Sequence, residues 1–172
     1  MGCPITLTGI AYECKDAVGG IKEVMIFEDY SNVASVDTSL GKISAITLDS
    51  SLNKPKVYKF RKETGTFDVA ATTSDEAGTT FYQTDVVLQF TKMETAKRLE
   101  IGALLIGNVS MIVKDGNGIY WYLGKDYPVT ATAGTATAGK AMGDFNGYTI
   151  TLVDKSVELP FEVPQSVIDT LV

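Results

Sequence analysis

The chain has no histidine, and its 172 residues include only two cysteines, Cys3 and Cys14. Without histidine, the usual base for activating a serine or threonine nucleophile is absent; lysine or an acid could replace it, so an enzyme is disfavoured rather than excluded. Two cysteines are too few for a disulfide framework and have no metal-binding neighbours, so we expect buried or idle thiols. We therefore expect no enzyme, no cofactor and no bound metal.

Long apolar runs and an excess of positive charge are also lacking. The longest apolar stretch, Ile101–Ile106, is far shorter than the roughly 20 residues that cross a bilayer. The first residues lack the charged and apolar regions of a signal peptide. The net charge of −6 argues against sequence-independent binding of nucleic acid, which needs lysine and arginine. We expect a protein made in the cytoplasm, with no membrane partner.

The composition that remains is that of a folded β protein. A length of 172 residues with 45% hydrophobic residues predicts one domain with its own core. We expect a mainly β fold with one α-helix, as a β-sandwich or partly closed β-barrel. The single domain 1–172 would include a mobile N-terminal segment 1–20 and a C-terminal extension 159–172, with a single helical turn at Ser166–Leu171. Early strands are expected at Ile21–Phe27, at Lys42–Leu48 with Ile43 and Ile46 on opposite faces, and at Val57–Arg61.

The middle of the chain predicts a long β-hairpin. Strands at Gly65–Thr73 and Thr79–Thr91 flank the polar turn Ser74–Gly78, which suits a hairpin loop. The second strand has an apolar face toward its C-terminal end, but both faces become polar and threonine-rich near the turn. We expect this hairpin, Lys62–Gln89 in all, to project from the domain as an exposed edge unless a partner covers it.

One amphipathic helix is expected after the hairpin. Thr91 and Glu94 fit a capping box, and Gly107 suits the helix C-terminus. One face has apolar residues at steps of three and four, and it is expected to cover the sheet. That face comprises Met93, Ala96, Leu99, Ala103 and Ile106. The expected sheet partners of Leu99, Ala103 and Ile106 are Val86, Leu88, Phe90, Ile112 and Ile150.

The remaining segments predict a second hairpin and a closing strand. Strands at Val109–Lys114 and Ile119–Leu123 flank Asp115–Gly118, a strong hairpin signal. The stretch Tyr127–Gly143 is rich in Gly, Ala and Thr, so we expect a loop, with the closing strand at Tyr148–Val153.

Three local motifs have a structural explanation that we favour. Asp115–Gly118 and Asp144–Gly147 look faintly like calcium loops, but each offers one carboxylate where calcium needs several. Turn chemistry explains both better. The aromatic run Tyr120–Tyr122 could stack nucleic-acid bases, but no basic residues interleave it, so packing is favoured.

The order of elements over roughly Phe60–Val163 resembles that of tail-tube-type structural proteins of tailed bacteriophages. The resemblance is carried by TKMETAKRLEIGALLIGN, by the hairpin around KDGNGIYWYLG, and by AMGDFNGYTITL after a Gly/Thr/Ala-rich loop. The resemblance is particularly to the proteins of phages of Bacteroidetes hosts and of crAss-like phages. It implies a tail-tube-type fold with a projecting hairpin, in which two sheets and one helix form a module. Modules would associate side by side, so that their sheets line an acidic channel, and a hairpin or loop would reach the adjoining subunit or ring.

This resemblance predicts a structural subunit of a viral tail tube or tail ring, located in the virion tail and forming a channel for genome delivery. Its partners would be further copies in a closed ring, adjacent tail or portal-connector rings, and phage DNA that passes without specific binding. The alternative is a virion decoration protein, a head–tail completion protein or an adhesive binding module.

Two groups of residues would carry the tail function. Subunit contacts are expected at the hairpin tip, at Thr72, Thr73, Thr79, Thr80, Phe81 and Tyr82. Asp68 and Asp85 are expected to be lumen charges that repel the phosphates of passing DNA. Solvated charges on the outside of the protein are an equally good reading of these two residues.

Overall fold

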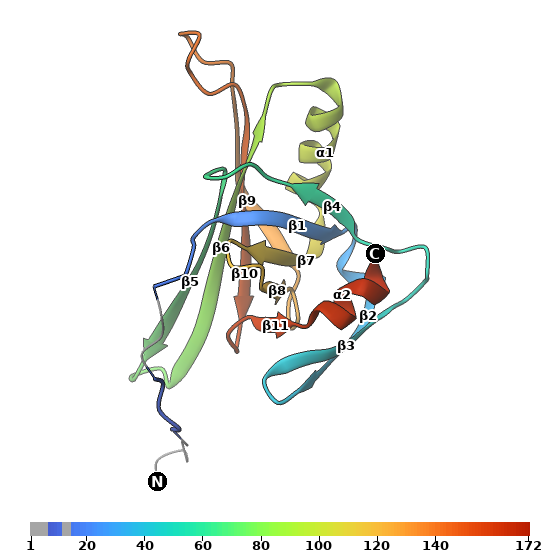
Figure 1. Ribbon diagram of the computed structural model, residues 1–172, viewed down its shortest axis with the longest axis vertical. Helices are drawn as coiled ribbons and strands as arrows, with labels where there is room; N and C mark the ends of the chain where they lie inside the picture. The colour runs from blue at the N-terminus through green and yellow to red at the C-terminus, as the bar shows by residue number, and fades with distance from the viewer. Residues whose placement is uncertain (1–6, 12–14) are drawn as a thin grey trace.

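The computed structural model describes residues 7–11 and 15–172 (Figure 1), so Cys3 and Cys14 lie outside the described residues. The described chain is mainly β, as the sequence predicts. Its helices are α1 (Thr95–Ile106), α2 (Gln165–Leu171) and the short 3-10 turn η1 (Tyr30–Asn32). Its strands are β1 (Ile21–Phe27), β2 (Val33–Ser39), β3 (Lys42–Leu48), β4 (Lys56–Lys59), β5 (Gly65–Ser74), β6 (Thr79–Thr91), β7 (Asn108–Asp115), β8 (Tyr120–Leu123), β9 (Val129–Thr137), β10 (Gly147–Ser156) and β11 (Phe161–Val163).

The strands form two sheets that share β7. The first sheet has the order β2-β3-β11-β8-β7, with β1 and β4 added beside β7. The second sheet has the order β9-β10-β6-β5, and it joins the first where Asn108 and Val109 of β7 pair with Thr130 and Val129 of β9. The strands of the two sheets cross steeply in Figure 1. The result is an unclosed, sandwich-like fold, which confirms the predicted class.

The main hydrophobic core lies between the two sheets and α1. Strict alternation on β6 and β10 turns Val86, Leu88, Ile150 and Leu152 toward this core, because successive side chains of a strand point to opposite faces. The first sheet supplies side chains from β1, β7 and β8, and α1 supplies two. The other buried members are Ile21, Val24, Ile26, Ile101, Leu104, Val109, Met111, Val113, Leu123 and Val129.

A second core lies on the other side of the first sheet, so that sheet is buried on both faces. Met25 and Phe27 of β1 point into it, whereas their neighbours Val24 and Ile26 point into the main core. The unbroken apolar run of β1 is explained by this double burial. Helix α2 covers the second core with Val167, Ile168 and Leu171. Residues 159–172, expected as an extension, therefore contribute β11 and α2 to the fold.

Several strands match their predicted positions closely. β1 and β3 have the predicted bounds, and the β5–β6 and β7–β8 hairpins form around the predicted turns. The predicted alternation on β3 is wrong, because Ile43 and Ile46 are both buried. The register of β2 against β3 shifts between Asp37 and Thr38, and this irregularity moves Ile43 and Ile46 to one face. Strand β2 itself was not predicted.

The predicted loop at Tyr127–Gly143 is wrong, because most of it is strand β9. β9 pairs with β10 over Thr130–Thr137. Its small residues are explained by α1, which packs across it: a Cβ atom added to Gly134 would lie 2.8 Å from a methyl group of Leu105. The strand therefore keeps a flat surface on which the helix can lie. The loop is confined to residues 138–146, at the top of Figure 1.

The predicted orientation of α1 is also wrong. Leu99 is 63% exposed and Ile106 is 89% exposed, whereas the buried residues of the helix are Ile101 and Leu104. The second half of α1 is apolar on several sides, so spacing alone could not decide which side meets the sheet. Among the predicted partners, Ile112 lies in the second core, away from α1.

The predicted capping box does not form either. Thr91 pairs with Gly147 in the sheet, and α1 starts after Glu94, whose side chain makes no capping hydrogen bond. The segment before the helix is instead held by the loop 138–146, because the Met93 N–H donates a hydrogen bond to the Asn146 side chain at 3.0 Å.

Replacing Leu104 with alanine should lower the free energy of unfolding by about 2–5 kcal/mol, because it leaves a cavity in the main core. The matched variant Leu99→Ala, on the exposed side of the same helix, should change it by about 0.5 kcal/mol or less. Urea denaturation followed by circular dichroism measures both. Equal losses in the two variants would contradict this orientation of the helix.

Candidate assembly surface

The outer face of the second sheet is not covered by any described element. Alternation turns the residues between the core positions outward on all four strands. We call this surface the open face; it includes Asp68, Gln83, Asp85, Val87, Thr132, Thr151, Val153 and Lys155, which line a shallow hollow. A sheet in a monomeric sandwich commonly has one solvated face. A solvated face alone therefore does not mark an assembly surface. The open face is a candidate assembly surface because of the residues that it carries.

Asp68 and Asp85, the two predicted lumen charges, lie directly opposite each other on this face. They are register partners on β5 and β6. Gln83 donates a side-chain hydrogen bond to Asp85 at 3.0 Å. Like charges directly opposite on a sheet are destabilising, so this pair gives nothing to the fold of one copy. A basic residue, Lys155, also lines the hollow.

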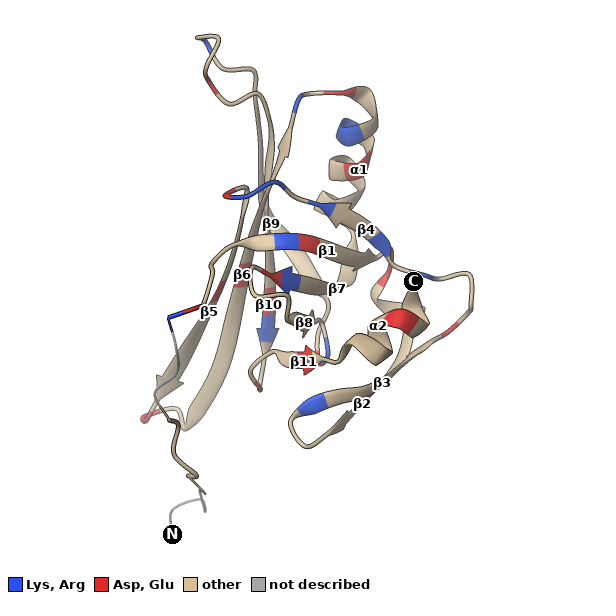
Figure 2. Ribbon diagram, in the orientation of Figure 1, with Lys and Arg blue, Asp and Glu red and all other residues tan. Residues whose placement is uncertain are grey.

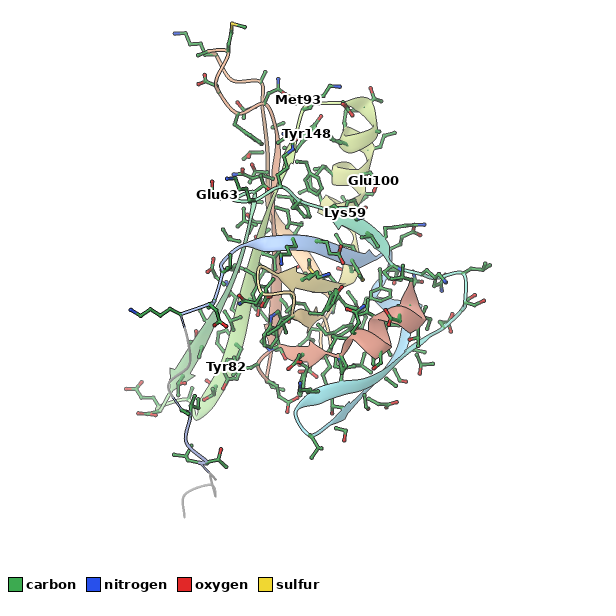
Figure 3. The ribbon with its side chains drawn as sticks, viewed as in Figure 1. Lys59, Glu63, Tyr82, Met93, Glu100 and Tyr148 are labelled. Atoms are coloured by element: carbon green, nitrogen blue, oxygen red, sulfur yellow. The ribbon has the colours of Figure 1, made fainter. Side chains whose placement is uncertain are left out.

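The tip of the β5–β6 hairpin extends past the rest of the sheet. β10 pairs with β6 only as far as Tyr82, so Thr79–Phe81 and their partners on β5 continue beyond it. Tyr82, labelled in Figure 3, is half-buried, and Phe81 is exposed beside it. The remaining predicted contact residues, Thr72, Thr73, Thr79 and Thr80, are all exposed.

The hairpin is also the most acidic part of the protein. From Gly65 to Thr91 it contains four acidic residues and no lysine or arginine: Asp68, Asp75, Glu76 and Asp85. Figure 2 shows red without blue along these strands, whereas blue appears on the segment that enters β5 and on α1. The hairpin therefore carries a local charge of −4 within a chain whose net charge is −6.

Both ends of the second sheet present edges with unpaired backbone. Within the described residues, β5 pairs only with β6 along its ten residues. β9 meets β7 at only two positions, so most of its second edge has no strand beside it among the residues that the structure describes. Natural proteins usually blunt such edges with lysine, proline or a bulge, and β5 contains neither lysine nor proline. β5 is therefore suited to pairing with another strand.

The two loops that faintly resemble calcium sites use their carboxylates as turn residues. Asp115 accepts the backbone N–H groups of Asn117 and Ile119, each at 2.9 Å. Asp144 accepts those of Ala141 and Lys140, and these bonds hold the pKa of Asp144 below its usual value. No group of three potential metal ligands was found among residues 7–11 and 15–172.

The aromatic run of β8 is used for packing. Tyr120 and Tyr122 are buried in the second core, and Trp121 lies on the opposite side of the strand. The Trp121 indole N–H donates to Asp115 at 3.1 Å, which ties the strand to its own turn.

A buried carboxyl group that the sequence reasoning missed lies inside the fold. Asp154 is 4% exposed, on the core-facing side of β10 opposite Thr84. Its Oδ1 atom has no hydrogen-bond partner in the described structure, and neither has the buried hydroxyl of Tyr122. The signal was present in the sequence: Asp154 continues the alternation of Ile150 and Leu152, so it had to face inward.

Burial raises the pKa of Asp154 to about 6, and the charge of Asp126 adds to this effect. Backbone N–H groups of Gly124 and Lys155 oppose it. Burial likewise raises the pKa of Tyr122 to about 12, with the charge of Asp154 contributing. The carboxyl group therefore takes up a proton more readily in the folded protein than in the unfolded chain.

Because the folded pKa of Asp154 is the higher one, its stabilising effect is complete below about pH 4 and is lost as the pH rises through about 6. The difference amounts to at most roughly 3 kcal/mol. We expect Asp154→Asn to remove this part of the pH dependence, measured by urea denaturation at pH 4.5 and 7.5. Asp37→Asn, at an exposed aspartate on β2, is the control. An identical pH dependence in Asp154→Asn and the unmodified protein would contradict the assignment.

No helix in the described part of the chain is long and apolar enough to cross a membrane. Comparison with protein-family models, with curated proteins and with solved structures gives no match to this chain.

Proposed function

We propose that this protein is a structural subunit of a viral tail tube or tail ring, which associates with copies of itself to form a channel for the genome. The observation that carries the proposal is the open face of the second sheet, bordered at both ends by unpaired strand edges. The resemblance of Phe60–Val163 to tail-tube-type proteins supports the same reading.

The two edges differ, and this difference favours a ring. Pairing β5 of one copy with β9 of the next joins two different surfaces, which makes a heterologous interface. Such an interface closes into a ring when its rotation allows closure. Pairing would also remove the exposed edge of β5, and the open faces of successive copies would become one continuous surface.

The charges of the open face suit a channel wall. In a ring, each subunit repeats the opposed carboxylates of Asp68 and Asp85, so the wall carries a belt of negative charge. Phosphates of DNA are repelled by such a belt, and the genome can slide without binding. The cost of opposing two like charges in one copy is then explained by their use in the assembly.

The hairpin tip is tested by charge substitutions that leave the core untouched. Thr72→Lys combined with Phe81→Lys changes an opposed pair on β5 and β6. We expect the unmodified protein to form rings or tubes, seen by light scattering and negative-stain electron microscopy, and this variant to remain a folded monomer. The matched control is Thr38→Lys with Ser44→Lys, two exposed positions on the β2–β3 hairpin.

Normal assembly of the Thr72/Phe81 variant would rule out the hairpin tip as a contact. An unmodified protein that stays monomeric at high concentration would instead favour a decoration protein, a head–tail completion protein or an adhesive binding module.

The channel charges are tested in assembled particles. Replacing Asp68 and Asp85 with lysine should leave assembly intact and slow genome ejection, most strongly at low salt, where screening is weakest. Asp37→Lys with Asp49→Lys, two exposed aspartates near the other hairpin, gives the same change in net charge and should leave ejection unchanged. Equal ejection kinetics for both double variants at low salt would exclude Asp68 and Asp85 as channel charges.

A further inference from the structure

Helix α1 presents a second apolar face that nothing in the described structure covers. This exposed helix face is defined by Ala96, Leu99, Ala103 and Ile106, and Met93, which precedes the helix, is also exposed. Leu99 is 63% exposed and Ile106 is 89% exposed, although leucine and isoleucine are normally removed from water. Contiguous apolar surface of this kind commonly marks a site of protein contact.

A groove beside this face gives it a defined shape. One wall comes from α1 and the other from β4. The lining residues are Leu99, Glu100, Ala103 and Leu104 of α1, Lys56 and Tyr58 of β4, and Ile26, Glu28 and Val109. Glu100, labelled in Figure 3, accepts a 2.6 Å hydrogen bond from the Tyr58 hydroxyl and holds the two walls together. Apart from Glu28, Lys56 and Glu100, the lining is apolar or aromatic, which suits contact with the apolar side chains of a short peptide segment.

The N-terminal segment has that character and, unlike the uncharged strands of the sheets, has exposed apolar side chains. The first twelve residues carry no charged side chain. Within the described part of this segment, Leu7 is 86% exposed and Ile10 is 97% exposed. Like the exposed helix face, these side chains gain nothing from the fold of a single copy.

The attachment of the N-terminal segment directs it away from its own α1. Val18 N–H donates to the side chain of Asn117 at 2.7 Å, and Gly116 N–H donates to the Gly20 carbonyl at 2.8 Å. The described residues 7–11 lie at the same end of the molecule as the tip of the β5–β6 hairpin, while α1 lies at the other end (Figure 1). Val18 follows Leu7 by eleven positions, which in extended form span about 36–40 Å. The segment can therefore reach a neighbouring copy.

We propose that Leu7–Ala11 of one copy binds the exposed helix face and groove of a second copy. Leu7 and Ile10 would lie against Leu99, Ala103 and Ile106, so that each copy donates one segment and accepts another. This exchange goes beyond the proposed tail function, because it holds for any assembly of the chain. It also uses a surface separate from the open face and from the hairpin tip.

Disulfide trapping between two differently tagged proteins tests the exchange. Both proteins carry Cys3→Ser and Cys14→Ser, which removes the two native thiols. One then carries Thr8→Cys and the other carries Ala103→Cys, at exposed positions in the segment and on the helix. We expect mild oxidation of the mixture to give a covalent heterodimer. The matched control replaces Ala103→Cys with Thr38→Cys, on the β2–β3 hairpin.

Adding Leu99→Glu to the Ala103→Cys protein should lower the heterodimer yield about tenfold or more, since burial of a leucine is worth at least that factor. Its circular dichroism should be unchanged, because Leu99 is exposed in the single copy. Three results would overturn the proposal. They are an equal yield with Thr38→Cys, a crosslink within a single chain that carries both Thr8→Cys and Ala103→Cys, and homodimers formed by the Ala103→Cys protein alone. The Thr72/Phe81 variant separates the proposed ring assembly from the proposed segment exchange. We expect it to lose ring assembly while the heterodimer still forms, because the exchange uses a surface separate from the hairpin tip.

Discussion

The fold depends on the pairing of β7 with three other strands. β7 pairs with β1, with β8 and, at its first two residues, with β9. Val109–Val113 is buried throughout, because one side of the strand faces the main core and the other faces the second core. Each sheet is therefore held in place by the same strand. A polar substitution within this run would disturb both cores, whereas the same change at the edge of either sheet would affect one.

The open face follows from how the two cores are arranged. The first sheet lies in the middle and is covered on both sides, so the second sheet has only one neighbour and its other side stays in solvent. Helix α1 fills the part of the inner side that the first sheet does not reach, with Ile101 and Leu104. Only one side of α1 packs into the main core, so its other apolar residues remain on its exposed face.

Much of the fold could be predicted from local patterns. An unbroken apolar run was sufficient for β1, and alternation and turn residues were sufficient for the β5–β6 and β7–β8 hairpins and for the core face of β6 and β10. Strand β2 was missed because its side chains are half-buried or exposed, which leaves little hydrophobic signal. Strand β9 was missed because its small residues accommodate α1, a contact between elements distant in sequence. The face of α1 was misassigned because the surrounding structure, not periodicity, selects between its apolar sides.

The candidate assembly surface was likewise predictable in part from local patterns and in part not. Alternation was enough to put Asp68 and Asp85 on the side away from the core, but their direct opposition depends on the register of the hairpin. The groove beside α1 depends on how β4 lies near the helix, which local sequence does not encode. The burial of Asp154 was predictable, because this residue continues the alternation of Ile150 and Leu152 and therefore faces the core.

The position of β11 has a consequence for folding during synthesis. β11 lies between β3 and β8, parallel to β3 and antiparallel to β8, although more than a hundred residues separate it from β3. Until residues 161–163 have left the ribosome, the β2–β3 hairpin has no strand linking it to the rest of its sheet. The second core also waits for α2, which follows directly. The nascent chain must therefore keep Ile43 and Ile46 from aggregating until β11 and α2 have been made, a situation in which chaperones commonly act.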